Sequence, residues 1–150
     1  MFISYIKNKK GNENSILLHN DGSFCAHNVY YDFQIFLKEN RSLILNFDLY
    51  SKICVSCEGF LVNKKIKKSE IKIDNYIDGA LVINLLTETL DLPYFEYFLD
   101  ENLSYDEINN KICFGKIGEE IIKFGNGQYA SFSNNKLVGI ILELTSKTYQ

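Results

Sequence analysis

Residues 121–144, IIKFGNGQYASFSNNKLVGIILEL, decide the fold, because they encode two strands around a tight turn and then a third strand. Asn126-Gly127 is a preferred pair for a two-residue hairpin turn, in which both residues need a positive φ. Asn134-Asn135 offers a second turn before a further apolar run. We therefore predict an antiparallel sheet that includes this end of the chain.

The first residues of the chain also show strand patterns. Residues 2–6 are a short apolar run that could open a sheet, and residues 16–31 have the pattern of a second hairpin. We place its two-residue turn at Asp21-Gly22, because this pair also suits positive φ. Both ends of the chain therefore contribute hairpins.

A long alternating segment follows. Residues 43–61 alternate between apolar and polar side chains, which is typical of an antiparallel sheet with one face in water. The segment exceeds a typical strand of about 5–6 residues, so we expect a break near residues 50–52. Residues 30–40 fit either a strand or a short helix.

The middle of the chain has helical signals. Apolar side chains in residues 78–90 recur at spacings of three and four, although a buried strand is the alternative for the first half of this segment. Pro93 suits the first turn of a second helix, which we extend to residue 102. Ser104 and Glu107 form an S-x-x-E capping box that predicts a third helix.

These elements predict an α+β fold in a single globular domain, residues 1–150. Its antiparallel sheet is built from the N- and C-terminal hairpins, and two or three short helices come from the middle of the chain. We find neither a secretory signal nor an apolar run of about 20 residues, and we expect a cytoplasmic protein with reduced thiols.

No motif in the sequence names a reaction. A Gly-rich phosphate loop, an H-E-x-x-H pair and an EF-hand loop are all missing from it. In the predicted hairpin His19 lies opposite Phe24, and the side chains of His19 and His27 fall on opposite faces, where they cannot act as an acid–base pair. We therefore expect no catalytic residue.

The four cysteines give no strong metal or redox signal. Cys54 and Cys57 have CxxC spacing, but in a regular strand residues i and i+3 point to opposite faces, and no second CxxC exists. Cys25 and Cys113 fit small core residues. We expect no metal and no cofactor.

Charge is distributed unevenly along the chain. Residues 1–72 carry eleven basic and seven acidic side chains, whereas residues 73–110 carry nine acids and no base. The basic run at residues 64–72 could contact a nucleic acid, but the acidic block begins two residues later and would repel phosphates. We therefore expect a basic protein as the partner, and neither a nucleic acid nor a membrane.

The acidic stretch 91–107, DLPYFEYFLDENLSYDE, holds six acids and five aromatic residues. Wound as a helix, residues 93–102 place Phe95, Phe98 and Leu99 on one side as core. Tyr97 falls on the other side, inside a frame of carboxylates, where a tyrosine could anchor a basic partner and the carboxylates could speed its capture. The predicted contact surface comprises Glu96, Tyr97, Asp100, Glu101, Asp106 and Glu107, with Tyr97 as the hot spot.

With its small size, missing catalytic motif and acidic aromatic stretch, the chain resembles the immunity proteins that bacteria make against contact-dependent and other polymorphic toxins. The resemblance is one of type, and no residue is carried over from it. It implies a non-enzymatic inhibitor that binds one cognate toxin domain in the cytoplasm. A nuclease is the natural basic target, because its active site is built to hold phosphates.

Two other classes remain open. Clustered carboxylates in residues 74–107 could hold a divalent metal and hydrolyse phosphate esters. The chain could also be a structural or phage-type assembly subunit, in which the acidic block of one copy meets the basic run 64–72 of a neighbour. We favour a monomeric inhibitor over these alternatives.

Overall fold

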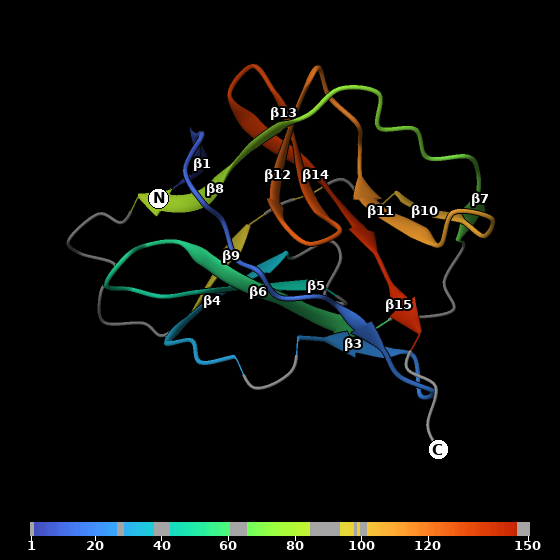
Figure 1. Ribbon diagram of the computed structural model, residues 1–150, viewed down its shortest axis with the longest axis horizontal. Coiled ribbons are helices and arrows are strands. Elements are labelled where there is room, and N and C mark those ends of the chain that lie inside the picture. Colours follow the sequence, from blue (N-terminus) through green and yellow to red (C-terminus); the bar gives the residue numbers. More distant parts are fainter. Residues whose placement is uncertain are drawn as a thin grey trace.

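The C-terminal hairpin turns at the predicted pair, although Gly127 and not Asn126 has a positive φ, and it lies inside a large sheet. Strands β12 (Glu120–Gly125) and β13 (Gln128–Ser133) turn at Asn126-Gly127, and β13 pairs next with β14 (Lys136–Glu143). Figure 1 shows the computed structural model, which describes residues 2–26, 29–37, 43–60, 66–84, 94–97, 99 and 102–146. These residues contain no helix, and thus none that could cross a membrane.

The predicted α+β class is wrong, because the described part of the chain is all β and forms two sheets. The first sheet has eight strands. In spatial order they are β1 (Phe2–Lys7), β8 (Ile77–Asn84), β12, β13, β14, β11 (Lys111–Gly115), β10 (Leu103–Asp106) and β7 (Lys67–Lys68).

The second sheet has seven strands among the described residues. In spatial order they are β15 (Thr145–Ser146), β2 (Leu17–Leu18), β3 (Ser23–Cys25), β6 (Cys54–Phe60), β5 (Leu43–Phe47), β4 (Phe33–Leu37) and β9 (Tyr94–Tyr97). The strand at residues 2–6 and the break between β5 and β6 are as predicted. The ambiguous segment 30–40 contains strand β4, and its residues 38–40 lie outside the described part.

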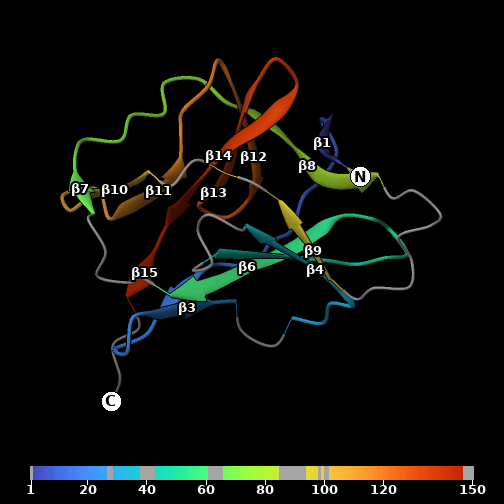
Figure 2. The same ribbon diagram turned by 180° about the vertical axis from the view of Figure 1, so that it is seen from behind.

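The two sheets pack face to face around one core. Figures 1 and 2 show β12, β13 and β14 in one layer and β3, β5 and β6 in the other. Among the residues whose burial the structure describes, six phenylalanines are fully buried, and burying each contributes on the order of 2 kcal/mol relative to an exposed ring. They come from both sheets: Phe24, Phe33, Phe47, Phe114, Phe124 and Phe132.

The sheets are also joined through the backbone. β14 continues through Leu144 into β15, so the chain passes from the first sheet into the second. An isolated bridge between Ile53 and Val82 links the start of β6 to β8. These links fix how the two layers sit on each other.

The connector between β1 and β2, residues 8–16, adds a third tie. The Asn12 side-chain amide donates to the Phe124 carbonyl at 3.1 Å and to Gln128 Oε1 at 3.2 Å. The Gln128 amide donates back to Asn12 Oδ1 at 3.0 Å. Asn14 Nδ2 donates to the Val55 carbonyl at 2.7 Å, so the connector is bonded to both sheets.

Another segment covers the outer face of the eight-stranded sheet. We call residues 69–76, between β7 and β8, the crossing segment; in Figures 1 and 2 this green chain arches over that sheet. Ile71 and Ile73 point into a small second core formed with Ile121, Tyr129 and others. The intervening residues Glu70, Lys72 and Asp74 are exposed.

The helix predicted over residues 78–90 is wrong in its first half, because residues 77–84 form strand β8. Its partners are β1 on one side and β12 on the other. Leu81, Val82 and Ile83 are consecutive and all buried, as in a strand that is covered on both faces. Such a run also satisfies helical spacing, so periodicity could not separate the two. Residues 85–90 lie outside the described part.

The two later helices are wrong as well. Residues 94–97 form β9, which pairs in parallel with β4, while Pro93 lies outside the described part. The capping-box segment forms β10, a turn and β11. The turn is closed by Asp106, which accepts bonds from the backbone and the side chain of Asn109.

Candidate binding surface

The predicted contact surface around Tyr97 does not form as expected. Glu96 and Tyr97 are neighbours in strand β9, so their side chains point to opposite faces. The Tyr97 ring is half-buried against the core, and its hydroxyl donates to the Leu137 carbonyl at 3.0 Å. Burial raises the pKa of Tyr97. Asp100 and Glu101 lie outside the described residues.

The next two predicted contact residues have different surroundings. Asp106 is only 4% exposed and accepts bonds from the backbone N–H of Ile71 at 2.9 Å and of Asn109 at 3.1 Å. The Asn109 side-chain amide donates to it at 2.8 Å. Glu107 is exposed and lies 3.6 Å from the Lys68 ammonium. Asp106 therefore closes the β10–β11 turn and anchors the crossing segment.

Asp106 should make the stability of the fold depend on pH. Its bonds from Asn109 and from the Ile71 N–H lower the pKa of the carboxyl to about 2. A carboxyl whose pKa is lower in the folded protein stabilises it above the unfolded pKa of about 3.9 and loses this effect as pH falls toward 2. At pH 7 we expect the Asp106→Asn variant to unfold at a lower urea concentration than the wild type. The difference should shrink between pH 4 and 2, and a constant gap in urea titrations would contradict this role.

An aromatic pair lies on the outer face of the eight-stranded sheet. The ring of Tyr76, at the end of the crossing segment, is 47% exposed and packs edge-on against Tyr129 of β13, with centroids 5.6 Å apart at 73°. The Lys123 ammonium lies 5.5 Å from the Tyr76 ring centre and 6.0 Å from that of Tyr129. Tyr76 is thus an exposed ring on a rigid base.

Carboxylates surround this pair. The Tyr129 hydroxyl donates to Glu143 Oε1 at 3.0 Å. Burial, and next the charge of Glu143, raise the pKa of Tyr129 far above its ordinary range, and Asp78 contributes in the same direction. Asp74 and Asp78 are exposed and stand two residues before and after Tyr76. We call Asp74, Tyr76, Asp78, Lys123, Tyr129 and Glu143 the tyrosine patch.

The sequence contained a signal for this patch. Residues 70–74 alternate between exposed polar side chains and the apolar Ile71 and Ile73, and Tyr76 stands between Asp74 and Asp78 in the sequence. A tyrosine framed by carboxylates, the feature from which we predicted a contact surface in residues 91–107, is therefore also present here. Only the paired sheet shows that Lys123, Tyr129 and Glu143 lie beside Tyr76, since they come from three different strands.

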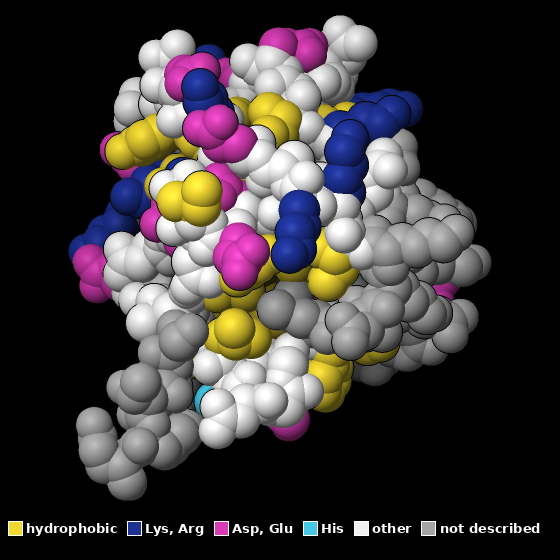
Figure 3. Space-filling view, turned by 90° about the vertical axis from the view of Figure 1, so that its right-hand side faces the viewer, with side chains coloured by type: hydrophobic (Ala, Val, Ile, Leu, Met, Phe, Trp, Pro, Cys, Tyr) yellow, Lys and Arg dark blue, Asp and Glu magenta, His cyan; other side chains and the backbone are white. Residues whose placement is uncertain are grey.

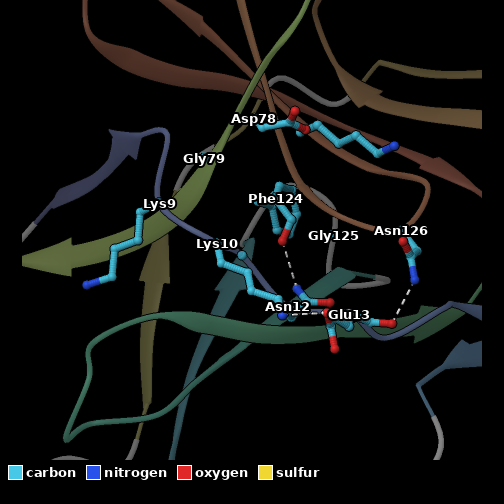
Figure 4. Close-up of a pocket in the computed structure, with 11 residues that line it drawn as sticks. Lys9, Lys10, Asn12, Glu13, Asp78, Gly79, Phe124, Gly125 and Asn126 are labelled. Atoms are coloured by element: carbon cyan, nitrogen blue, oxygen red, sulfur yellow. Dashed lines mark hydrogen bonds and ion pairs between the residues drawn. The ribbon is translucent and has the colours of Figure 1, made fainter.

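An open hollow of about 270 Å³ lies beside the connector. It is lined by residues 9–13, by Asp78 and Gly79, and by residues 123–126. Figure 4 shows Lys9 and Lys10 pointing in different directions, and Lys10 bonds Glu13 at 2.7 Å. Asn126 Nδ2 donates to the Glu13 carbonyl at 2.7 Å. Lys10, Glu13 and Asn126, which line the hollow, therefore bond one another. We interpret the hollow as a place where the connector packs against β12 and not as a binding site.

The CxxC pair is closer than predicted. A β-bulge sets Phe47 opposite Cys54 and Asn46 opposite Ser56, which brings Cys54 and Cys57 into the same core instead of onto opposite faces. Burial, and next the Cys54 thiol, raise the pKa of Cys57. Within the described residues no three His, Cys, Asp or Glu side chains are grouped so that they could hold a metal ion.

Charge on the β7–β10 edge is mixed. Figure 3, which faces this side of the molecule, shows lysine or arginine side chains close to aspartate and glutamate side chains. Lys68 with Glu107, and Lys72 with Glu70 at 3.8 Å, are two such exposed pairs. The separation of basic and acidic segments along the sequence is therefore partly lost in the folded protein, where lysines of the basic run lie beside glutamates.

Comparison with models of known protein families finds no match for this chain, and comparison with curated proteins finds none either.

Proposed function

We propose that the protein is a non-enzymatic binding protein that neutralises a basic toxin domain by covering it with the tyrosine patch. The observation that supports this most is the half-exposed Tyr76 ring, which is held against Tyr129 and flanked by Asp74 and Asp78. Tyr76 replaces Tyr97 as the proposed hot spot, because the Tyr97 hydroxyl is bonded to the protein's own backbone.

A tyrosine in this setting has the properties of an interface anchor. Its ring covers a large area with few rotatable bonds, so little conformational entropy is lost on binding. Tyr76 packs on a residue of a sheet strand, which limits its motion further. The phenol hydroxyl at the edge of the contact can still bond a partner or water.

The charges of the patch favour a basic partner. Of the six residues that define the tyrosine patch, three are carboxylates, Asp74, Asp78 and Glu143, and one is an ammonium, Lys123. Carboxylates around an anchor attract lysine and arginine and raise the rate of encounter at low salt. An enzyme that holds phosphates presents such basic groups at its active site, which is why we propose a nuclease as the toxin activity.

The described residues of the predicted contact surface divide into two groups. Glu96 and Glu107 are exposed and remain candidate contacts at the edge of an interface. Tyr97 and Asp106 bond the protein's own backbone, and a partner could use them only by breaking those bonds.

The test first searches the genes next to this one for an encoded toxic domain and then uses that domain as the partner. We expect co-expression of this protein to restore growth of cells that produce the domain, and the purified pair to bind in calorimetry. Tyr76→Ala should weaken binding by about 30-fold or more, as expected for a hot spot of about 2 kcal/mol. Tyr50→Ala, at a 96% exposed tyrosine of the β5–β6 turn, is the matched control and should change binding less than twofold.

Charge should act on the rate of association. In Asp74→Asn/Asp78→Asn we expect slower association at low salt and a weaker dependence on salt, with little change in dissociation. If growth is not restored and no binding occurs, the inhibitor proposal fails. Binding with equal effects of Tyr76→Ala and Tyr50→Ala would instead move the contact away from the tyrosine patch.

A further inference from the structure

The first hairpin differs from its predicted form by one residue. The loop holds three residues, Asn20, Asp21 and Gly22, and His19 closes it by donating its N–H to the Ser23 carbonyl at 2.8 Å. Gly22 has φ of 87°, and its N–H donates to the His19 carbonyl at 3.0 Å. Since Leu18 lies opposite Phe24, the predicted pairing of His19 with Phe24 is wrong.

This shift decides which side chains meet. Moving a strand by one residue exchanges its two faces. In the observed register Leu17 lies opposite Cys25, so Cys25 shares a face with His19, two residues along β2. The Cys25 sulfur lies 3.4 Å from His19 Nε2, which is within hydrogen-bonding range for sulfur.

The other three cysteines have different surroundings. Cys54 and Cys57 are 0% exposed and Cys113 is 2% exposed, whereas Cys25 is only partly buried. Burial raises the pKa of the Cys113 thiol to about 12. A thiol that stays protonated and covered reacts poorly with electrophiles. Cys25 therefore combines access to solvent with a neighbouring base, and the buried thiols serve as internal controls.

We propose that Cys25 is a reactive thiol which His19 activates toward hydroperoxides. His19 Nε2 accepts the thiol proton, and the resulting thiolate attacks one peroxide oxygen. The sulfur–oxygen bond forms while the oxygen–oxygen bond breaks, and the imidazolium returns the proton to the departing hydroxide or alkoxide. The products are the Cys25 sulfenic acid and water or an alcohol, so sulfur is oxidised by two electrons and the peroxide is reduced.

The charge nearest to His19 on the hairpin supports this step. The Asp21 carboxylate interacts electrostatically with His19, and its Oδ1 is fixed by bonds from the Ser23 N–H at 2.9 Å and the Ser23 hydroxyl at 2.6 Å. The carboxylate on the same hairpin carries the charge opposite to that of the imidazolium that forms when the proton is transferred. The hairpin thus supplies the thiol, the base and an anion.

The experiment compares the wild type, His19→Gln and Cys25→Ser. Native protein is treated with iodoacetamide at pH 7, and peptide mass spectrometry follows alkylation of each cysteine. We expect Cys25 to react at least about tenfold faster than Cys113, and His19→Gln to slow Cys25 by about tenfold, since an unassisted thiol is only a few per cent thiolate at pH 7. Equal thermal melting of the variants and continued protection of Cys113 show that the fold is kept.

Two further measurements show whether His19 acts on Cys25 by accepting its proton or only by packing against it. At pH 9.5 an unassisted thiol ionises by itself, so the Cys25 rates of the wild type and His19→Gln should become similar. Treatment with one equivalent of hydrogen peroxide and dimedone should label Cys25 in the wild type and leave Cys25→Ser unlabelled. The proposal is overturned by equal Cys25 rates at pH 7, by a rate difference that persists at pH 9.5, or by no dimedone adduct at Cys25.

Discussion

Replacing Gly139 with alanine is expected to lower the free energy of unfolding by about 3 kcal/mol or more. Gly139 of β14 lies opposite Gly115 of β11. A Cβ at Gly139 would stand 2.1 Å from the Lys116 carbonyl oxygen and 3.0 Å from the Lys116 backbone nitrogen. These atoms belong to the backbone, so no side chain can rotate away to make room.

The backbone around this site is fixed by its own bonds. Gly115 has φ of 88°, its N–H donates to the Asn102 carbonyl at 2.8 Å, and the Lys116 N–H donates to the Val138 carbonyl at 2.9 Å. Relief of the clash would have to open this pairing in the centre of a sheet. For a chain of this size we expect the melting temperature to fall by about 6–12 °C.

Urea unfolding followed by circular dichroism measures the effect of Gly139→Ala. Val138→Ala is the matched control, because it changes the preceding residue of the same strand at a half-buried position. We expect the control to cost less than about 1.5 kcal/mol. Equal unfolding midpoints for the two variants would show that β11 and β14 do not approach as closely as described.

The second large effect is expected from the amide pair that ties the connector to the sheets. Gln128 is fully buried, and its Nε2 donates to Asn12 Oδ1 at 3.0 Å and to the Asn14 carbonyl at 2.5 Å. Gln128→Leu keeps the volume but leaves both acceptors, and the Asn12 amide, short of a partner. An unpaired buried polar group costs about 1–3 kcal/mol, so we expect a loss of about 3 kcal/mol.

A double-mutant cycle shows whether this loss comes from the pair. Asn12→Leu alone should also destabilise the protein, and Gln128→Leu/Asn12→Leu should be more stable than the sum of the single effects predicts by about 1–2 kcal/mol. The reason is that removing both partners leaves fewer orphaned groups than removing one. Strict additivity in urea titrations would mean that the two amides do not bond each other.

The hairpin turns were predictable because their chemistry is local. Asn126-Gly127 turns as predicted, and residues 137–142 form the interior of β14. Asp21-Gly22 also lies at a turn, but whether the loop has two or three residues depends on the pairing of β3 with β6 as well as with β2. The position of a turn could be predicted, whereas its register could not, and the register brings His19 to Cys25.

The middle of the chain was mispredicted for a different reason. Residues 77–84 satisfy a helical and a strand pattern equally, and the choice depends on β1 and β12, which come from distant parts of the chain. The same holds for residues 94–97, which become a strand beside β4. Secondary structure in such segments is decided by partners that supply backbone bonds and cover both faces.

The sequence by itself determined where the two terminal hairpins turn, which runs are apolar enough to be buried, and that acidic residues are concentrated in residues 73–110, with five aromatic residues among them at 91–107. These properties depend on single residues and their nearest neighbours. Only the tertiary structure decided which face each side chain occupies. It buried Asp106, turned Tyr97 inward and packed Tyr76 against Tyr129 of β13, because strand pairing and bulges are set by contacts between residues far apart in the sequence.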